Sequence, residues 1–311
     1  MSTTPIIDAH AHILLEMRGQ NAAGPTRGLS YGRAAIGADE FQFLPPFNKQ
    51  VCHTAEMLIH HMDWAGIDRA VLLQGPFYGE CNDYVRESAA RFPERLIAVA
   101  YADPWEADAR ARFDREIAPH RTFRGVKIEF SQSYGLNGLH PDARLDDAHC
   151  DWLWRELEQR GMTLTFDLGG AGTRSYQTEG VRRIAERHPG LSIVIAHLGW
   201  PSLSAEANPE LWSQWRAQLT LGLLPNVYFD FAALPAAVSE EGYPFPSVER
   251  YLRIAVENIG AHKLIWGTDV PGTFRIATYQ QFVALARRHT AFLTPDDQAA
   301  LMGGAALKVY G

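Results

Sequence analysis

Residues 6–12 of the chain read Ile-Ile-Asp-Ala-His-Ala-His. Side chains two residues apart in a β-strand point to the same face, so His10 and His12 are predicted to project together from the end of a strand. Two imidazoles on one side of a rigid strand are suitable ligands for a divalent metal ion. The alternative is that both histidines only pack or face solvent. The stretch therefore predicts a buried first strand that ends in metal chemistry.

Further short apolar runs follow along the chain, separated by segments of helical character. The complete set of predicted strands comprises residues 6–12, 69–74, 96–103, 125–130, 163–169, 192–199, 227–234 and 264–270. Nearly continuous Val, Ile, Leu and Phe is typical of parallel strands that are buried on both faces. Alternation of such strands with helices predicts βαβ units, and this number of units in 311 residues favours an α/β fold, a single-domain (β/α)8 TIM barrel spanning 1–311. An open doubly wound sheet is the alternative, but its glycine-rich loop is missing after the first strand.

Helix signals and two long insertions complete the predicted organisation. Helices are expected at residues 54–65, 104–118, 147–160, 176–188, 247–259, 278–289 and 295–307, several of them bounded by capping residues or glycine. The insertions span about 13–53, after the first strand, and about 232–247, after the seventh. Loops of this length are usually functional, and both follow the strand ends at which barrel active sites lie.

Composition excludes several classes of function. The chain has 29 basic and 36 acidic residues, a net charge of −7, and shows no basic run, which argues against binding to nucleic acid or to a membrane surface. Its three cysteines are too few and too scattered for a disulfide framework. Neither a signal-peptide pattern nor a run of about 20 apolar residues is visible. The sequence predicts a cytoplasmic protein with a small-molecule substrate.

Polar residues also end the sixth and eighth predicted strands. His197 follows the apolar run Ile-Val-Ile-Ala, and Asp269 follows Leu-Ile-Trp-Gly-Thr. Taken alone, His197 is equally a core histidine, and Asp269 a turn residue before Pro271. The first and eighth strands of a closed barrel are neighbours, however, so Asp269 is expected beside His10 and His12. Together these residues predict one site at the carboxyl ends of the strands.

The chain resembles the amidohydrolase superfamily, in the branch that contains enzymes similar to aminocarboxymuconate-semialdehyde decarboxylase. The matching stretches are IIDAHAH, GIDRAVL (66–72), FRGVKI (123–128), IVIAHLG (193–199) and WGTDVP (266–271). The resemblance implies one divalent metal ion, Zn or Mn, held by His10, His12 and Asp269. It also implies a catalytic role for His197, and it makes Asp269 the catalytic group that moves protons.

Several positions depart from the family pattern or remain open. Asp167 stands where the family usually has a strand-five histidine; it is predicted as an oxygen ligand, with an acid–base role or a weak or absent metal as alternatives. Lys127 and Glu129 share one face of the fourth strand and are predicted to bind substrate. An ion pair inside the barrel, or a second metal bridged by a carboxylated lysine, are the alternatives, and one metal is favoured over two. Arg174 and Trp200 follow strand ends and are predicted substrate contacts.

Three functions are compatible with this site. The first is hydrolysis of a small lactone, ester or amide, and the second is non-oxidative decarboxylation of a small aromatic or unsaturated carboxylic acid. Decarboxylation needs a cationic partner, for which Lys127, Arg174, Arg27 and Arg33 are candidates. The third is a degenerate barrel that binds metal without catalysis. A homodimer is left open by analogy with relatives.

Overall fold

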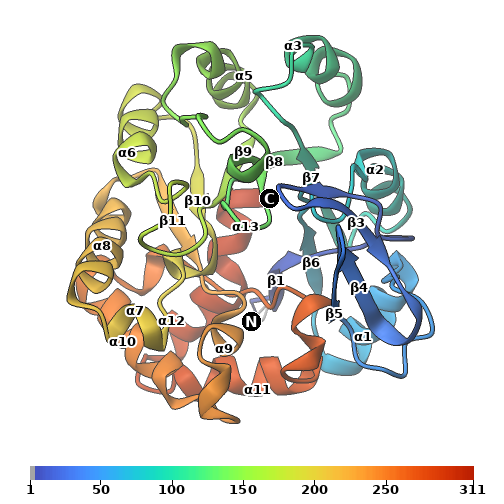
Figure 1. The fold of residues 1–311 in the computed structure, drawn as a ribbon. Coiled ribbons are helices and arrows are strands. Elements are labelled where there is room, and N and C mark those ends of the chain that lie inside the picture. Colours follow the sequence, from blue (N-terminus) through green and yellow to red (C-terminus); the bar gives the residue numbers. More distant parts are fainter. Residues whose placement is uncertain (1–3) are drawn as a thin grey trace.

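A parallel β-barrel ringed by helices forms the body of the molecule, as Figure 1 shows for the computed structural model, which describes residues 4–311. The barrel strands adjoin in the order β1-β6-β7-β8-β9-β10-β11-β12. Their bounds are β1 (Ile7–Ala11), β6 (Arg69–Leu72), β7 (Leu96–Tyr101), β8 (Phe123–Glu129), β9 (Thr163–Asp167), β10 (Ile193–Ile195), β11 (Val227–Asp230) and β12 (Leu264–Ile265). Each strand neighbours the next one of the barrel along the chain, which confirms the predicted (β/α)8 architecture.

The barrel closes where the chain after β12 meets β1. The amide of Ala9 donates to the carbonyl of Trp266 at 3.0 Å, and Asp269 N–H donates to the carbonyl of His10 at 2.7 Å. A parallel bridge between Ala11 and Val270 continues this seam. Closure therefore places the residues after β12 directly against the end of β1.

Helices cover the outside of the barrel. They are α1 (Ala55–Ala65), α2 (Asn82–Arg91), α3 (Ala109–Arg112), α4 (Leu136–Leu139), α5 (Asp151–Arg160), α6 (Thr178–Arg187), α7 (Leu203–Glu206), α8 (Pro209–Leu219), α9 (Leu234–Ala237), α10 (Pro246–Ile259), α11 (Tyr279–His289), α12 (Pro295–Ala299) and α13 (Ala305–Tyr310). The predicted caps of α1 are confirmed, because Thr54 Oγ1 accepts from Met57 N–H and Gly66 takes a left-handed φ of 71°. None of these helices in residues 4–311 has both the length and the apolar character needed to cross a membrane.

Several helices differ from the prediction, and the helix expected over 295–307 is divided into α12 and α13. The helix expected over 104–118 begins only at Ala109, because the Asp103 carboxylate accepts from Trp105 N–H and pairs with His140. Helices α2, α4, α7, α8 and α9 were not predicted. The sequence does mark the start of α8, since Asn208 accepts from the amides of its first turn and proline follows at the first helical position.

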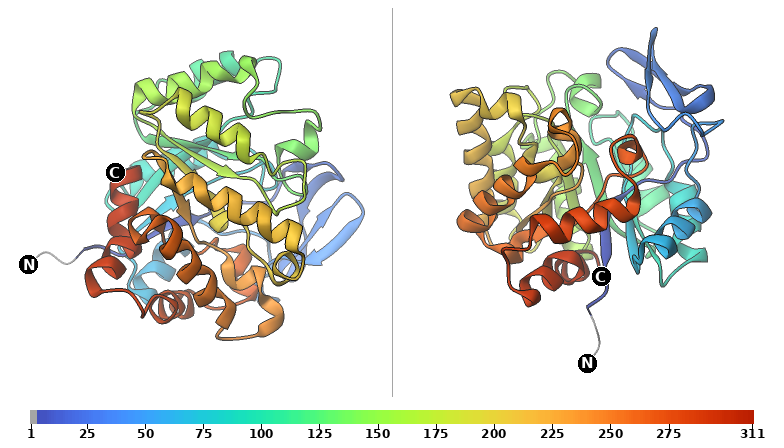
Figure 2. Two further views of the ribbon diagram at one scale, coloured as in Figure 1. Left: turned by 90° about the vertical axis from the view of Figure 1, so that its left-hand side faces the viewer. Right: turned by 90° about the horizontal axis from the view of Figure 1, so that it is seen from below.

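The first insertion is a small sheet, although the sequence predicted only a loop. It is antiparallel, with strands β2 (Gln20–Asn21), β3 (Gly24–Gly28), β4 (Arg33–Ile36) and β5 (Asp39–Gln42), and Figure 2 shows it extending outward from the barrel. Hydrogen bonds tie it to the segment after β6: Gln20 N–H donates to Pro76 O at 2.8 Å, and Thr26 Oγ1 to Phe77 O at 2.6 Å. The inserted sheet is thus held by hydrogen bonds beside the carboxyl ends of the barrel strands.

Candidate metal centre and active site

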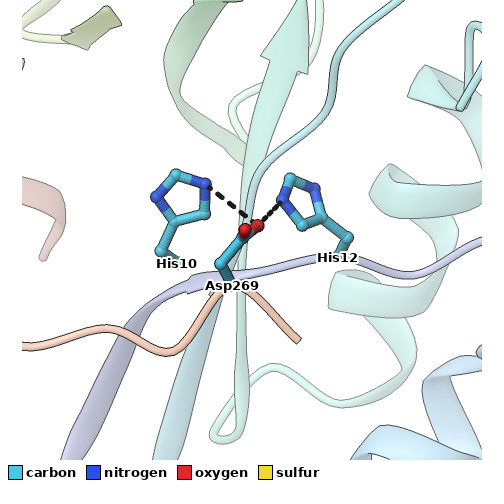
Figure 3. A group of neighbouring side chains, drawn as sticks. All are labelled: His10, His12 and Asp269. Atoms are coloured by element: carbon cyan, nitrogen blue, oxygen red, sulfur yellow. Dashed lines mark hydrogen bonds and ion pairs between the residues drawn. The ribbon is translucent and has the colours of Figure 1, made fainter. Parts of the chain in front are cut away.

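His10, His12 and Asp269 meet at the carboxyl ends of β1 and β12, as Figure 3 shows. His12 Nε2 lies 2.9 Å from Asp269 Oδ1, and His10 Nε2 lies 3.8 Å from the same oxygen. Both imidazoles are fully buried, while about a quarter of the Asp269 side chain is exposed. The potential ligand atoms of the three residues all lie within 4.8 Å of one another. The structure therefore brings together the three residues that the sequence predicted as neighbours.

The two imidazoles are oriented by partners at their other ring nitrogen. His12 Nδ1 lies 2.8 Å from the carbonyl of Leu73, which can only accept, so this nitrogen carries the hydrogen. His10 Nδ1 is 3.0 Å from Asp230 Oδ2. Burial lowers the pKa of both imidazoles, that of His10 with help from the nearby Lys127 charge, so both are neutral near pH 7.

This arrangement fits a cation. With the hydrogen on Nδ1, the lone pair of His12 Nε2 faces the Asp269 carboxylate, and two electron-rich atoms in contact require a proton or a metal ion between them. Neutral imidazoles and an ionised carboxylate are the protonation states that bind a divalent ion. Lys127 Nζ also lies 3.3 Å from His10 Nε2, but it has a second partner in Glu129 at 3.3 Å. The donor set is therefore suitable for one metal ion.

Asp269 is held in an unusual backbone conformation. Its φ is 65°, a left-handed value that is uncommon for non-glycine residues, although aspartate adopts it more readily than most. Burial would raise the pKa of its carboxyl group, but the hydrogen bond with His12 and the neighbouring imidazoles outweigh burial and lower this pKa to about 2. Asp269 is consequently an ionised acceptor of protons or a metal ligand over the whole physiological pH range.

Asp167 lies outside this three-residue group, so the structure does not support its predicted role as a metal ligand. Its Oδ2 is 3.0 Å from Nε2 of His197, whose Nδ1 is 3.1 Å from the carbonyl of Ala232. Burial acts to lower the pKa of His197, but the charge of Asp167 prevails and raises it to about 10. The carboxylate at the end of β9 is therefore paired with an imidazolium in the short turn Ala196–Gly199 that follows β10.

Lys127 and Glu129 form a buried ion pair, the alternative that the sequence left open. The Lys127 ammonium is 98% buried, and the surrounding carboxylates raise its pKa despite the opposing effect of burial. A lysine must be a neutral amine before it can be carboxylated, so this environment does not favour a lysine-bridged pair of metals. Burial and the charge of Asp167 raise the pKa of Glu129 to about 7.

Asp230 is a member of the site that the sequence analysis missed. Besides orienting His10, it accepts through Oδ1 from the amides of His197 at 2.9 Å and Ala232 at 3.0 Å. From a fully buried position at the end of β11, it connects the group formed by His10, His12 and Asp269 with His197. The signal was weak, since Asp230 lies within the apolar run 227–234, whereas Asp269 comes at the end of its run.

A cavity of about 360 Å³ opens beside these groups. Of the predicted substrate contacts, Lys127, Glu129 and Trp200 line it, whereas Arg174 is exposed and does not, so the structure does not support that contact. Residues that the sequence did not single out include Arg275 and Tyr78, whose ring packs against His12 with centroids 4.6 Å apart and the planes tilted by 39°. Both belong to loops that follow strands, where periodicity carries no signal.

Comparison with known proteins places this site in context. A family model described as Amidohydrolase matches residues 7–311. An L-fucono-1,5-lactonase from Burkholderia ambifaria is 28% identical over 254 residues, 79% of this chain and 81% of that protein. Among solved structures, a probable 2-pyrone-4,6-dicarboxylic acid hydrolase from Acinetobacter baumannii has a TM-score of 0.68 at 16% identity, covering 98% of this chain and 99% of that one. An amidohydrolase from Burkholderia multivorans with bound zinc has a TM-score of 0.69 at 20% identity and the same coverage.

Proposed function

The chain belongs to the amidohydrolase family, and on this premise we propose that it opens the ring ester of a small lactone with one bound divalent metal ion. The observation that carries the proposal is the convergence of His10, His12 and Asp269 within 4.8 Å at the edge of a cavity. The L-fucono-1,5-lactonase at 28% identity supports a lactone as the class of substrate.

His10, His12 and Asp269 would hold the metal ion. Two imidazole nitrogens and one carboxylate oxygen suit zinc and also manganese, and the zinc-bound structure from Burkholderia multivorans supports zinc. When bound, such an ion supplies Lewis-acid polarisation of a carbonyl group and lowers the pKa of water. Asp230 and the carbonyl of Leu73 keep both imidazoles turned toward that position.

The protein's own groups divide the remaining chemistry. Asp269, ionised above about pH 2, accepts the proton of the attacking water and passes it to the ring oxygen as the carbon–oxygen bond breaks. His197, kept cationic by Asp167, stabilises through its charge the oxyanion that develops on the carbonyl oxygen, since its two ring N–H groups already face Asp167 and the carbonyl of Ala232. Trp200 packs edge-on against His197, with ring centroids 5.2 Å apart, and lines the cavity beside it.

Decarboxylation is the second candidate. Its need for a cation beside the substrate is met in the cavity by Lys127 and Arg275, whereas Arg27, Arg33 and Arg174 do not line it. A non-catalytic barrel that only binds metal is the third.

We also propose a single catalytic domain, a cytoplasmic location, and a small-molecule substrate rather than nucleic acid or membrane. A homodimer is proposed by analogy with relatives.

Two measurements test the proposal. Metal content per chain is compared between the wild type and a His10→Ala/His12→Ala variant, with His149→Ala/His262→Ala on the exposed surface as the matched control. Ring opening of small lactones and release of CO₂ from aromatic carboxylic acids are then scored on the same preparations. We expect metal and lactonase activity to be lost only in the first variant. CO₂ release without ring opening would favour decarboxylation, and neither activity would favour the non-catalytic barrel.

A further inference from the structure

Arg275 differs from the other cations that line the cavity in having no acidic partner. Lys127 is paired with Glu129 at 3.3 Å, and His197 with Asp167 at 3.0 Å. Arg275 Nε donates to the carbonyl of Gly272 at 3.2 Å, but within residues 4–311 no carboxylate lies within 4.0 Å of its guanidinium. Its remaining N–H groups are therefore available to an anion in the cavity.

The position of Arg275 ties it to the reacting centre. It ends the short helical turn Gly272–Arg275, which directly follows Asp269 and the proline at 271. Thr273 N–H donates to the carbonyl of Asp269 at 3.4 Å, so one compact turn carries both residues. An anion on Arg275 would consequently belong to the same bound molecule whose reacting group lies at Asp269.

One side of the cavity is aromatic. We define the aromatic wall as Phe41, Phe43, Phe77, Tyr78 and Tyr134, from the inserted sheet and the loops after β6 and β8. The ring of Phe77 lies at its centre, with centroids 5.6 Å from Phe43, 5.2 Å from Tyr78 and 5.7 Å from Tyr134. Through Tyr78, the wall continues to His12. Such a surface favours a flat unsaturated ring that can stack or meet the rings edge-on.

Several hydroxyl groups of the lining already have main-chain partners. Thr173 Oγ1 donates to Gly170 O at 2.8 Å and Thr273 Oγ1 to Thr268 O at 3.0 Å, while Ser131 Oγ accepts from Tyr134 N–H at 3.3 Å. A substrate with many hydroxyl groups would need partners for each of them, because burial without hydrogen bonds is costly. The O–H groups of Thr173 and Thr273 are therefore not free to donate to a bound molecule.

We infer that the cavity selects a planar lactone carrying a single carboxylate, with the ring against the aromatic wall and the carboxylate on Arg275. The inference rests on the proposed lactonase function and names the substrate class of that site. It differs from what the names of the relatives describe: the aromatic wall favours a flat ring over the saturated ring of a sugar lactone, and a dicarboxylate has one charge more than the single unpaired cation in the described lining matches.

The test uses four lactones with the metal-loaded enzyme. They are 2-oxopyran-5-carboxylate, its uncharged carboxamide, 2-pyrone-4,6-dicarboxylate and L-fucono-1,5-lactone. The variant is Arg275→Gln, and Arg288→Gln, exposed on the outer face of α11, is the matched control. We expect the monocarboxylate to have the highest kcat/KM. Arg275→Gln should lower its kcat/KM about tenfold or more, since a charge-assisted hydrogen bond is lost, and should leave the carboxamide within about twofold. Arg288→Gln should change neither.

The outcomes separate this inference from the proposed function. An equal loss on monocarboxylate and carboxamide in Arg275→Gln, or highest kcat/KM for the sugar lactone or the dicarboxylate, would overturn the inference while leaving a lactonase. Failure of the wild type to open any of the four lactones would overturn the proposed function together with the inference.

Discussion

His12 and Asp269 are separated by 257 positions in the sequence, yet His12 Nε2 and Asp269 Oδ1 lie 2.9 Å apart across the seam that closes the barrel. Backbone hydrogen bonds on the same seam, from Asp269 N–H to His10 O and from His12 N–H to Val270 O, hold the two segments in register. The site is consequently assembled by barrel closure itself, and its geometry depends on the two strand ends rather than on a mobile loop.

Asp269→Asn removes the proton acceptor while preserving the shape of the side chain. Because general acid–base catalysis contributes about 10²–10⁴-fold, kcat for lactone opening should fall by at least about 100-fold. Steady-state kinetics with Asp142→Asn, an exposed aspartate, as the control would measure the effect. A kcat within tenfold of the wild type would show that another group moves the proton.

Asp230→Asn tests the support of the metal ligands. Asp230 touches His10 Nδ1 at 3.0 Å and does not line the cavity described above, so its replacement should act on the metal through His10. Loss of such a partner typically weakens metal binding about 10–100-fold. Competition with a chromophoric chelator would measure the affinity, and circular dichroism would verify folding. Unchanged affinity in a folded variant would rule out this orienting role.

Asp167→Asn distinguishes a metal ligand from a partner of His197. The ion pair at 3.0 Å predicts that the variant keeps its metal, because Asp167 lies outside the His10–His12–Asp269 group. The pKa of His197 should fall when its strongest stabilising charge is removed, and kcat should drop about tenfold or more. Metal content and kcat are measured on the same sample. Loss of metal would mean that Asp167 is a ligand after all.

Glu129 predicts a pH dependence of stability. Its pKa rises from 4.5 to about 7 in the folded protein, first through burial and then through the charge of Asp167. The folded state thus holds this proton more tightly than the unfolded state, so this group lowers stability as pH rises from about 4.5 through 7. In chelator-treated protein, Glu129→Gln should gain roughly 1–3 kcal/mol relative to the wild type between pH 5 and pH 9, measured by urea denaturation. A constant difference over that range would contradict the assignment.

Sequence patterns were sufficient for the barrel and for part of the site. The spacing of His10 and His12 and the adjacency of the first and last strands were enough to predict the contact with Asp269, because barrel topology fixes which strand ends are neighbours. The partner of Asp167 could not be predicted in the same way. A metal ligand and a partner of His197 would both need a carboxylate that points into the barrel at position 167. Which of the two the carboxylate turns toward is not visible in the sequence.

Other features carried weaker signals. The strands of the inserted sheet are two to five residues long and contain Gly, Pro and charged side chains, so they lack the alternation that marks a strand. Arg275 lies in an irregular turn, where its exposure to the cavity depends on the path of the chain after Pro271. Asp230 interrupts the apolar run 227–234 of the seventh predicted strand, where the sequence pattern does not reveal that β11 ends at this residue.

Removal and return of the metal ion test whether lactone opening depends on it. Enzyme is stripped with a chelator, freed of it, assayed on a lactone that the untreated enzyme opens, and then titrated with zinc or manganese. We expect that stripping lowers the rate at least 100-fold and that one equivalent of metal per chain restores it. Full activity in protein shown to contain no metal would contradict this expectation.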